Sequence, residues 1–494
     1  MDKGLAGARG AGGGSSREAA LARAEAMVEG GRFAQDLAAL VAFETESQDP
    51  RQAPELRRYL LEGLAPRLER LGVAWEVVEN PDGRGGPALL GERREGEGGP
   101  VVLTYGHGDV IRGQAEGWRE GLHPFRLQAE GERLYGRGTA DNKGQHLLNL
   151  LALEAVMAER AVAEGGRLGF DLRLLVETSE ETGSPGLHAL ARAHRDRLAA
   201  DVLIASDGPR LRPGTPTLFG GARGALAFDL VVRLREGAQH SGNWGGALAD
   251  PAQVLAHALS AIADRWGRLL VPEWRPPEPS PEIRAALDAL PAPEGGPAPD
   301  VGWGEEWLSL AERLYAWNGF AVLAMTSGRP EAPVNAIADE ARATCQLRFT
   351  ADTDPEDILP ALRRHLDREG FGEGFRRVEI RPLGEGLFRA TRLDPRHPWM
   401  AWATASAARS AGRAPHVLPN LAGSLPNDVF ADLLGMPTVW VPHSYAGCSQ
   451  HAPDEHLLLP VARDAIRVMA GLWWDLGEPG TPSRAGERGA RGGS

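Results

Sequence analysis

Each of three mostly apolar runs in this 494-residue chain is followed within a few residues by histidine or acidic residues. These residues are His107 and Asp109 after the run 101–105, Glu180 and Glu181 after 170–176, and Asp207 after 202–205. Short apolar runs of this kind are typical of strands buried inside a parallel sheet. Because ligands bind beyond the carboxyl ends of such strands, we expect these side chains to meet at one edge of a sheet.

Two further candidates lie in segments that should reach the same edge. Asp141 stands just ahead of a predicted helix, where a carboxylate acts either as a metal ligand or as a helix N-cap. His451 follows the last predicted strand of the chain. Imidazole and carboxylate together suit zinc, manganese or cobalt, and a pair of such cations can activate water against a carbonyl group. Histidines without such neighbours, for example His146, are expected to be packing or surface residues.

The composition argues against several other classes of protein. A formal net charge of −13 disfavours binding to nucleic acid or to an anionic membrane, because both need concentrated lysine and arginine. The two cysteines, Cys345 and Cys448, are too few for a disulfide framework or a cysteine cage around zinc, and they fit a reducing compartment. No stretch approaches the ~18 apolar residues of a membrane span, and the N-terminus lacks the apolar core of a secretory signal. We therefore expect a cytoplasmic protein.

The segments around the candidate residues alternate between helical and strand periodicity. Over residues 1–217 the alternation is typical of an α/β layer, with a mixed, largely parallel sheet and helices on both faces. Over 218–387 the pattern is α+β, and it returns to α/β over 388–476. The sequence thus predicts one α/β domain interrupted by a smaller α+β domain. Residues 1–16 and the Gly- and Arg-rich tail 477–494 are expected to be disordered.

Apolar spacing also predicts where individual elements lie. The expected helices are 17–28, 33–45, 54–71, 143–159, 187–195, 251–264, 354–369, 399–410 and 461–472. The expected strands are 75–78, 88–90, 101–105, 170–176, 202–205, 225–234, 320–325, 341–349, 378–382 and 438–441. The stretch 271–301 is rich in proline and glutamate, so we expect a long loop there.

Six short motifs in chain order resemble those of one enzyme family. They are HGD at 107–109, GRGTADNKG at 136–144, SEETGS at 179–184, SDG at 206–208, HSGNWGG at 240–246 and QHAPDE at 450–455. The family is that of the di-zinc metallopeptidases, which includes aminoacylase, succinyl-diaminopimelate desuccinylase, carboxypeptidase G and carnosine dipeptidase. The resemblance extends over about residues 33–475, and it is specific for the family rather than for a substrate.

The resemblance implies a role for each matching residue. His107, Asp141 and Asp207 would bind one metal ion, and Asp141, Glu181 and His451 the other, so that Asp141 bridges the two. Glu180 would be the general base and acid, and Asp109 would orient His107. His240 resembles the histidine that reaches a partner subunit's site and stabilises the oxyanion, although it could also simply fill a loop. Arg348 resembles the arginine that binds the substrate carboxylate, unless it is an ordinary surface arginine. Asn335, Gly423 and Ser424 resemble further substrate contacts.

The resemblance therefore implies a hydrolase that cleaves the amide bond of a dipeptide or a related carboxylate-bearing amide with two divalent cations. Zinc is the expected metal, with manganese and cobalt as alternatives. The inserted domain would serve as lid and as the contact of a homodimer, and its length favours a dipeptidase or carboxypeptidase. The alternative is an N-acyl amino acid deacylase, and a more remote one is a non-catalytic binding protein. No nucleic-acid or membrane partner is expected.

Overall fold

The computed structural model of this protein describes residues 16–482, except 97, 165–166, 293 and 295. Of the two segments expected to be disordered, residues 1–15 and 483–494 lie outside the described residues. Ser16 is part of the fold, because its side chain caps the first helix by accepting a hydrogen bond from the Ala19 amide. The beginning of the expected tail also contacts the fold, since Glu478 forms an ion pair with Arg160.

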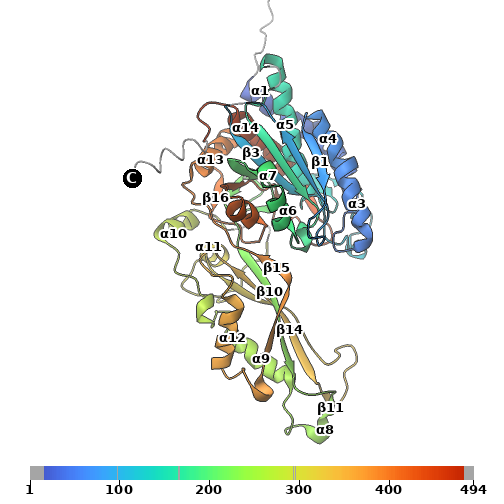
Figure 1. Ribbon diagram of the computed structural model, residues 1–494, viewed down its shortest axis with the longest axis vertical. Helices are drawn as coiled ribbons and strands as arrows, with labels where there is room; N and C mark the ends of the chain where they lie inside the picture. Colours follow the sequence, from blue (N-terminus) through green and yellow to red (C-terminus); the bar gives the residue numbers. More distant parts are fainter. Residues whose placement is uncertain (1–15, 97, 165–166, 293, 295, 483–494) are drawn as a thin grey trace, which may run out of the picture.

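The larger part of the fold is an eight-stranded mixed sheet (Figure 1). In spatial order its strands are β1 (Ala74–Val78), β2 (Ala88–Arg93), β6 (Asp171–Glu177), β3 (Val101–His107), β7 (Val202–Ala205), β17 (Thr438–Trp440), β9 (Thr217–Phe219) and β16 (His416–Leu418). The central strands β6, β3, β7 and β17 are parallel neighbours, whereas β1 and β2 pair antiparallel at one edge. The carboxyl ends of the central strands therefore open on one edge of the sheet, as the sequence predicts.

Helices cover both faces of this sheet, and each face has its own apolar core. One face carries α1 (Arg17–Glu29), α2 (Arg32–Val41), α5 (Lys143–Glu164), α13 (Pro398–Ala411) and α14 (Leu459–Leu476). The other face carries α6 (Leu187–Ala193), α7 (Arg195–Leu198) and the π-helical turn Val429–Leu433. Alternate residues of a strand point to opposite faces, so Leu103 and Tyr105 join one core and Val102 the other.

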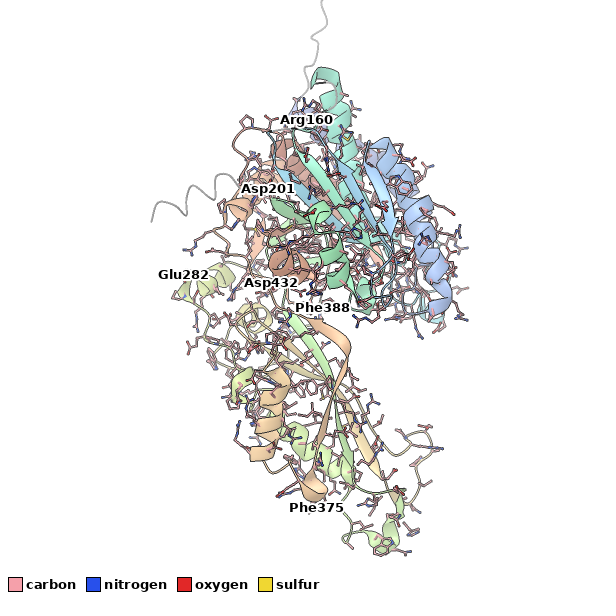
Figure 2. All side chains as sticks on the ribbon, viewed as in Figure 1. Arg160, Asp201, Glu282, Phe375, Phe388 and Asp432 are labelled. Atoms are coloured by element: carbon pink, nitrogen blue, oxygen red, sulfur yellow. The ribbon has the colours of Figure 1, made fainter. Side chains whose placement is uncertain are left out.

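A second, four-stranded antiparallel sheet forms the smaller part, drawn below the large sheet in Figure 1. Its order is β12 (Gly319–Ser327), β14 (Glu340–Phe349), β10 (Gly224–Arg233) and β15 (Glu379–Phe388). Helices α9 (Pro251–Ile262) and α12 (Ile358–Arg368) share an apolar core with it. At the far tip, β11 (Gln239–His240) pairs with β13 (Ala336–Ile337) and leads into α8 (Ser241–Trp244). Phe388 ends β15 at the junction of the two parts, and Phe375 lies far from it (Figure 2).

Short elements complete the described fold. They are the helical segments Pro50–Gln52, Ala53–Arg58, Tyr59–Leu64, Ala65–Arg70, Ala115–Gly117, Glu180–Thr182, Pro272–Trp274, Pro281–Asp288 (α10), Leu310–Tyr315 (α11) and Gly374–Arg376, and the strands Gln128–Glu130 (β4), Arg133–Tyr135 (β5), Pro209–Arg210 (β8), Ser444–Tyr445 (β18) and His456–Leu458 (β19). Across the described residues, no helix is both long enough and apolar enough to cross a membrane.

Two expected helices and one expected loop differ in the structure. The helix expected over 33–45 ends at Val41, and the one expected over 54–71 contains a π-helical stretch at Tyr59–Leu64. The loop expected over 271–301 contains helix α10, whose N-cap Ser280 accepts a hydrogen bond from the Ile283 amide. Ser-Pro-Glu is an ordinary start of a helix, and the surrounding prolines obscured it.

The chain passes from the large sheet to the small one between β9 and β10. Position 218, where the sequence analysis begins the inserted domain, lies inside β9, which pairs within the large sheet. The small sheet begins at Gly224. Residues 220–223, between these two strands, therefore connect the large part of the fold to the small part.

Candidate metal centre and active site

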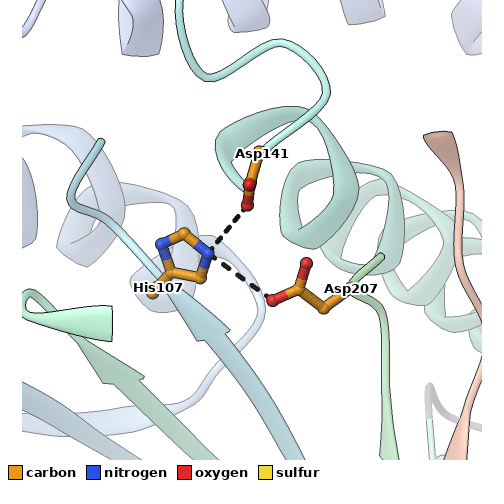
Figure 3. Close-up of side chains that lie close together, drawn as sticks. All are labelled: His107, Asp141 and Asp207. Carbon is orange, nitrogen blue, oxygen red and sulfur yellow. Dashed lines mark hydrogen bonds and ion pairs between the residues drawn. The ribbon is translucent and has the colours of Figure 1, made fainter. Parts of the chain in front are cut away.

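His107 lies between two carboxylates at the carboxyl edge of the large sheet (Figure 3). Its Nε2 is 3.0 Å from Asp141 Oδ1 and 3.5 Å from Asp207 Oδ2. His107 is the last residue of β3, and Asp207 follows β7, so the two neighbouring parallel strands deliver them to one place. All three side chains are buried, and their potential ligand atoms lie within 4.8 Å of one another.

A second group of ligand atoms shares Asp141 with the first. His451 Nε2 is 3.0 Å from Asp141 Oδ2 and 3.0 Å from Glu181 Oε2. The two oxygens of Asp141 therefore face different histidines, one in each group. The structure brings together all five residues that were expected from the sequence to bind metal. It groups them in the two expected sets of three, which share Asp141.

The charges of this cluster are poorly balanced by the protein itself. Burial first, and the neighbouring Asp141 second, raise the pKa of Glu181 to about 7 and also raise the pKa of Asp207. Burial likewise raises the pKa of Glu180, with only partial relief from His107. Hydrogen bonds to Asp141 and Glu181 raise the pKa of His451 to about 11. Crowded acids with such shifts mark a place where additional positive charge would be stabilising.

The donor set fits divalent cations. Asp207 Oδ2 is buried without a hydrogen-bond partner, although a buried carboxylate oxygen normally has one. Each group combines one imidazole nitrogen with two carboxylates, and a shared carboxylate can bridge two ions. No cysteine belongs to either group among the described residues. Zinc, manganese and cobalt are the cations that such mixed nitrogen and oxygen ligands suit.

Asp109 organises the backbone that carries the acidic pair. Its two carboxylate oxygens accept hydrogen bonds from the amides of Glu180 and Glu181, at 3.2 and 3.1 Å. His107 Nδ1 lies 3.1 Å from the Asp109 carbonyl oxygen and 3.4 Å from Oδ1. Asp109 therefore lies beside the far nitrogen of His107, and in addition it fixes the turn of Glu180 and Glu181.

Glu455 was not assigned a role from the sequence, although it ends the motif QHAPDE. Its Oε1 accepts hydrogen bonds from the amides of Gly138, Ala140 and Asp141 at 3.0, 2.9 and 3.1 Å. Its Oε2 accepts one from Arg137 Nη1 at 2.8 Å. These hydrogen bonds of the buried Glu455 side chain hold the loop that presents Asp141 in one conformation.

One face of α5 and the residue before it are polar and buried, which the sequence analysis also missed. The side chains are Asn142, Gln145, His146 and Asn149, spaced as on one face of a helix. Asn142 donates to the Ser206 carbonyl oxygen at 2.8 Å, and Gln145 donates to that of Ala140 at 2.7 Å, so both hold residues next to ligands. His146, expected to be a packing or surface residue, lies between Tyr59 Oη at 2.6 Å and Asn142 Oδ1 at 3.0 Å. The spacing of these polar residues was the signal available in the sequence.

A cavity of about 590 Å³ opens between the cluster and the small sheet. Its wall includes Glu180 and Glu181 from the large part of the fold and Arg348 of β14 from the small one. Gly423 and Ser424 also line it. The apolar lining residues include Leu211, Ala225, Ala227, Phe388, Leu418 and Leu421. The cavity is thus large enough for a dipeptide-sized molecule, and its two walls offer acids and a guanidinium.

His240 and Asn335 are not brought to this cavity within the chain. His240 is exposed at the far tip of the small sheet, where the Ser241 amide donates to the Asn335 carbonyl oxygen at 2.9 Å. The two residues thus lie beside each other at the tip formed by β11 and α8, which Figure 1 shows far from the large sheet.

A family model and several known proteins match this chain. The model of peptidase family M20/M25/M40 matches residues 103–475. Cysteinylglycine-S-conjugate dipeptidase of Corynebacterium striatum is 31% identical over 242 residues, covering 49% of this chain and 51% of that protein. Beta-Ala-His dipeptidase of Mus musculus is 33% identical over 254 residues, covering 49% and 50%. The chain thus spans about half the length of the curated relatives it matches. The solved structure of the di-peptidase Dug1p from Saccharomyces cerevisiae has the same fold, with a TM-score of 0.77 at 19% identity, covering 94% of this chain and 100% of that one.

Proposed function

The chain belongs to peptidase family M20/M25/M40, and from this membership we propose that it hydrolyses the amide bond of a dipeptide or a related amide with a free carboxylate. The observation that carries the proposal is the pair of ligand groups sharing Asp141 on the wall of a cavity that also contains Arg348. Cations at two such sites would polarise the carbonyl group of the amide to be cleaved, and a guanidinium would bind the carboxylate of the same molecule.

His107, Asp141 and Asp207 would hold one divalent cation, and Asp141, Glu181 and His451 the other. When bound, such cations polarise a carbonyl group and lower the pKa of water. Glu180 is then the residue that accepts the proton of the attacking water and returns it to the leaving amine. Asp109 supports this role because it holds the Glu180 amide. Zinc is the cation we propose, with manganese and cobalt as alternatives.

We also propose a homodimer formed through the small domain. Its edge strand β12 exposes Val322, Leu323 and Met325, which are 44%, 56% and 45% accessible. An exposed apolar edge strand is a surface for pairing with another chain. The position of His240 and Asn335 at the tip supports a role in a partner's site, where His240 would stabilise the oxyanion. The two cysteines of the chain are buried free thiols, which supports the cytoplasm as the compartment.

A substrate panel tests the proposed activity. Metal-loaded protein is assayed with dipeptides, N-acetyl and N-succinyl amino acids, and folyl-glutamate-like amides. Faster turnover of dipeptides supports the proposal, whereas exclusive turnover of N-acyl amino acids would identify a deacylase. Binding without turnover of any amide would identify a non-catalytic protein.

Glu180→Gln tests the assigned base. The variant should keep its metal content but lose about 100-fold or more in kcat, the usual contribution of a positioned general base. Metal content is measured by elemental analysis beside the rate. An unchanged rate in a fully loaded variant would show that another group moves the proton.

A further inference from the structure

Two arginines lie close together where the cavity meets the junction of the two sheets. Arg348 lies on β14, and Arg223 directly precedes β10. Arg223 Nε donates to the Ala422 carbonyl oxygen at 2.8 Å, and its Nη1 donates to that of Trp317 at 3.2 Å. Ala422 follows β16 of the large sheet, whereas Trp317 precedes β12 of the small one. The Arg223 guanidinium therefore joins the two parts of the molecule beside the cavity.

Ser424 links the two arginines. Its hydroxyl donates to the Arg223 carbonyl oxygen at 2.6 Å and accepts a hydrogen bond from Arg348 Nη1 at 2.7 Å. A hydroxyl has one proton to donate, and here that proton is used within the protein. Ser424 thus orients Arg348 in this structure, and it also lines the cavity.

Among the described residues, no acidic side chain forms an ion pair with either arginine, although the charge of Glu180 partly offsets the burial that lowers the pKa of Arg348. In the described part of the chain, the hydrogen-bond partners of both guanidinium groups are uncharged: two carbonyl oxygens for Arg223, and Ser424 with Gln346 for Arg348. Burial and the neighbouring Arg348 lower the pKa of Arg223 to about 10. Keeping two cations together in a largely buried place is unfavourable unless an anion joins them.

We propose that Arg223 is a positioning residue for recognition of the substrate carboxylate. It holds the Ala422–Ser424 segment against the small sheet, keeps Arg348 oriented through Ser424, and adds a second positive charge near Arg348. The inference rests on the proposed function, and it extends the carboxylate site beyond Arg348. Both arginines should strengthen the binding of substrates with a free carboxylate, whereas neither should strengthen the binding of the matching carboxamides.

The experiment compares a dipeptide with its C-terminal amide in wild type, Arg223→Met, Arg223→Lys, Ser424→Ala and Arg348→Met. Arg223→Met should raise KM for the free dipeptide about 10-fold, with kcat changed less than about 2-fold, because Arg348 loses its orientation and the site loses one of two positive charges. The kinetic constants for the amide should stay the same. Arg223→Lys keeps the charge and should recover part of the loss, and Ser424→Ala should shift KM in the same direction by less. Arg233→Met, an exposed position on β10, is the matched control and should match wild type.

The outcomes separate this inference from the proposed function. A loss in Arg223→Met that is equal for the free dipeptide and its amide would overturn the inference, because it would mean a general structural role. A KM rise in Arg348→Met without one in Arg223→Met would overturn it while leaving the proposed function intact. If wild type cleaves neither compound nor any other amide, the proposed function fails and the inference fails with it.

Discussion

Replacing Glu177 by glutamine tests the electrostatics beneath the proposed metal centre. Glu177 ends β6 and is only 4% exposed, and its Oε1 accepts hydrogen bonds from Tyr105 Oη at 2.7 Å and Ser184 Oγ at 2.9 Å. Burial first, and the charge of Asp109 second, raise its pKa from 4.5 to about 7. The folded protein therefore binds a proton at Glu177 more tightly than the unfolded chain does.

The sign and size of the effect follow from this difference in pKa. A carboxyl group with a raised pKa favours folding below the unfolded pKa, and this advantage disappears as the pH rises through the folded pKa. A pKa that rises from 4.5 to about 7 corresponds to about 3 kcal/mol, since each tenfold change in proton affinity is ~1.4 kcal/mol. The free energy of unfolding of the metal-free wild type, relative to Glu177→Gln, should thus fall by about 3 kcal/mol between roughly pH 4.5 and 8.

Urea unfolding of both metal-free proteins across this pH range measures the difference. Glutamine keeps an oxygen that can accept the bonds from Tyr105 and Ser184, but it cannot ionise. The variant Glu116→Gln at an exposed position is the control, and its difference from wild type should not vary with pH in this way. A difference between wild type and Glu177→Gln that stays constant from acid to neutral pH would refute the burial argument.

Two further predictions concern the proposed partner subunit and the buried face of α5. His240→Ala should lower kcat and keep its metal content. Mixed dimers of His240→Ala and Glu180→Gln subunits should regain activity if His240 acts across the dimer. No recovery in verified mixed dimers would contradict this. His146→Gln removes the imidazole between Tyr59 and Asn142, and should weaken metal binding about 10-fold or more, measured by competition with a chelator. The matched control is His365→Gln, a buried histidine in the small domain, which should leave metal affinity unchanged; equal effects in both would argue against a positioning role for His146.

Much of the fold could be predicted because its signals are local. The strand expected at 202–205 is observed at Val202–Ala205, and those expected at 101–105 and 170–176 are observed at Val101–His107 and Asp171–Glu177. Buried parallel strands are short apolar runs that stand out in the sequence. The candidate ligands could be found for the same reason, since His107 and Asp207 lie at the ends of such runs and strand ends share an edge.

The sequence by itself determined which residues reach the carboxyl edge, because strand order along the chain and side-chain chemistry are both local properties. Only the tertiary structure decided how Asp141 divides its two oxygens between His107 and His451, and that Glu455 holds the Asp141 loop across 314 positions of sequence. It also decided that Ser424 donates its proton to the backbone of Arg223. Such contacts depend on how whole layers of the fold pack against each other. Their distances therefore cannot be derived from the spacing of residues along the chain.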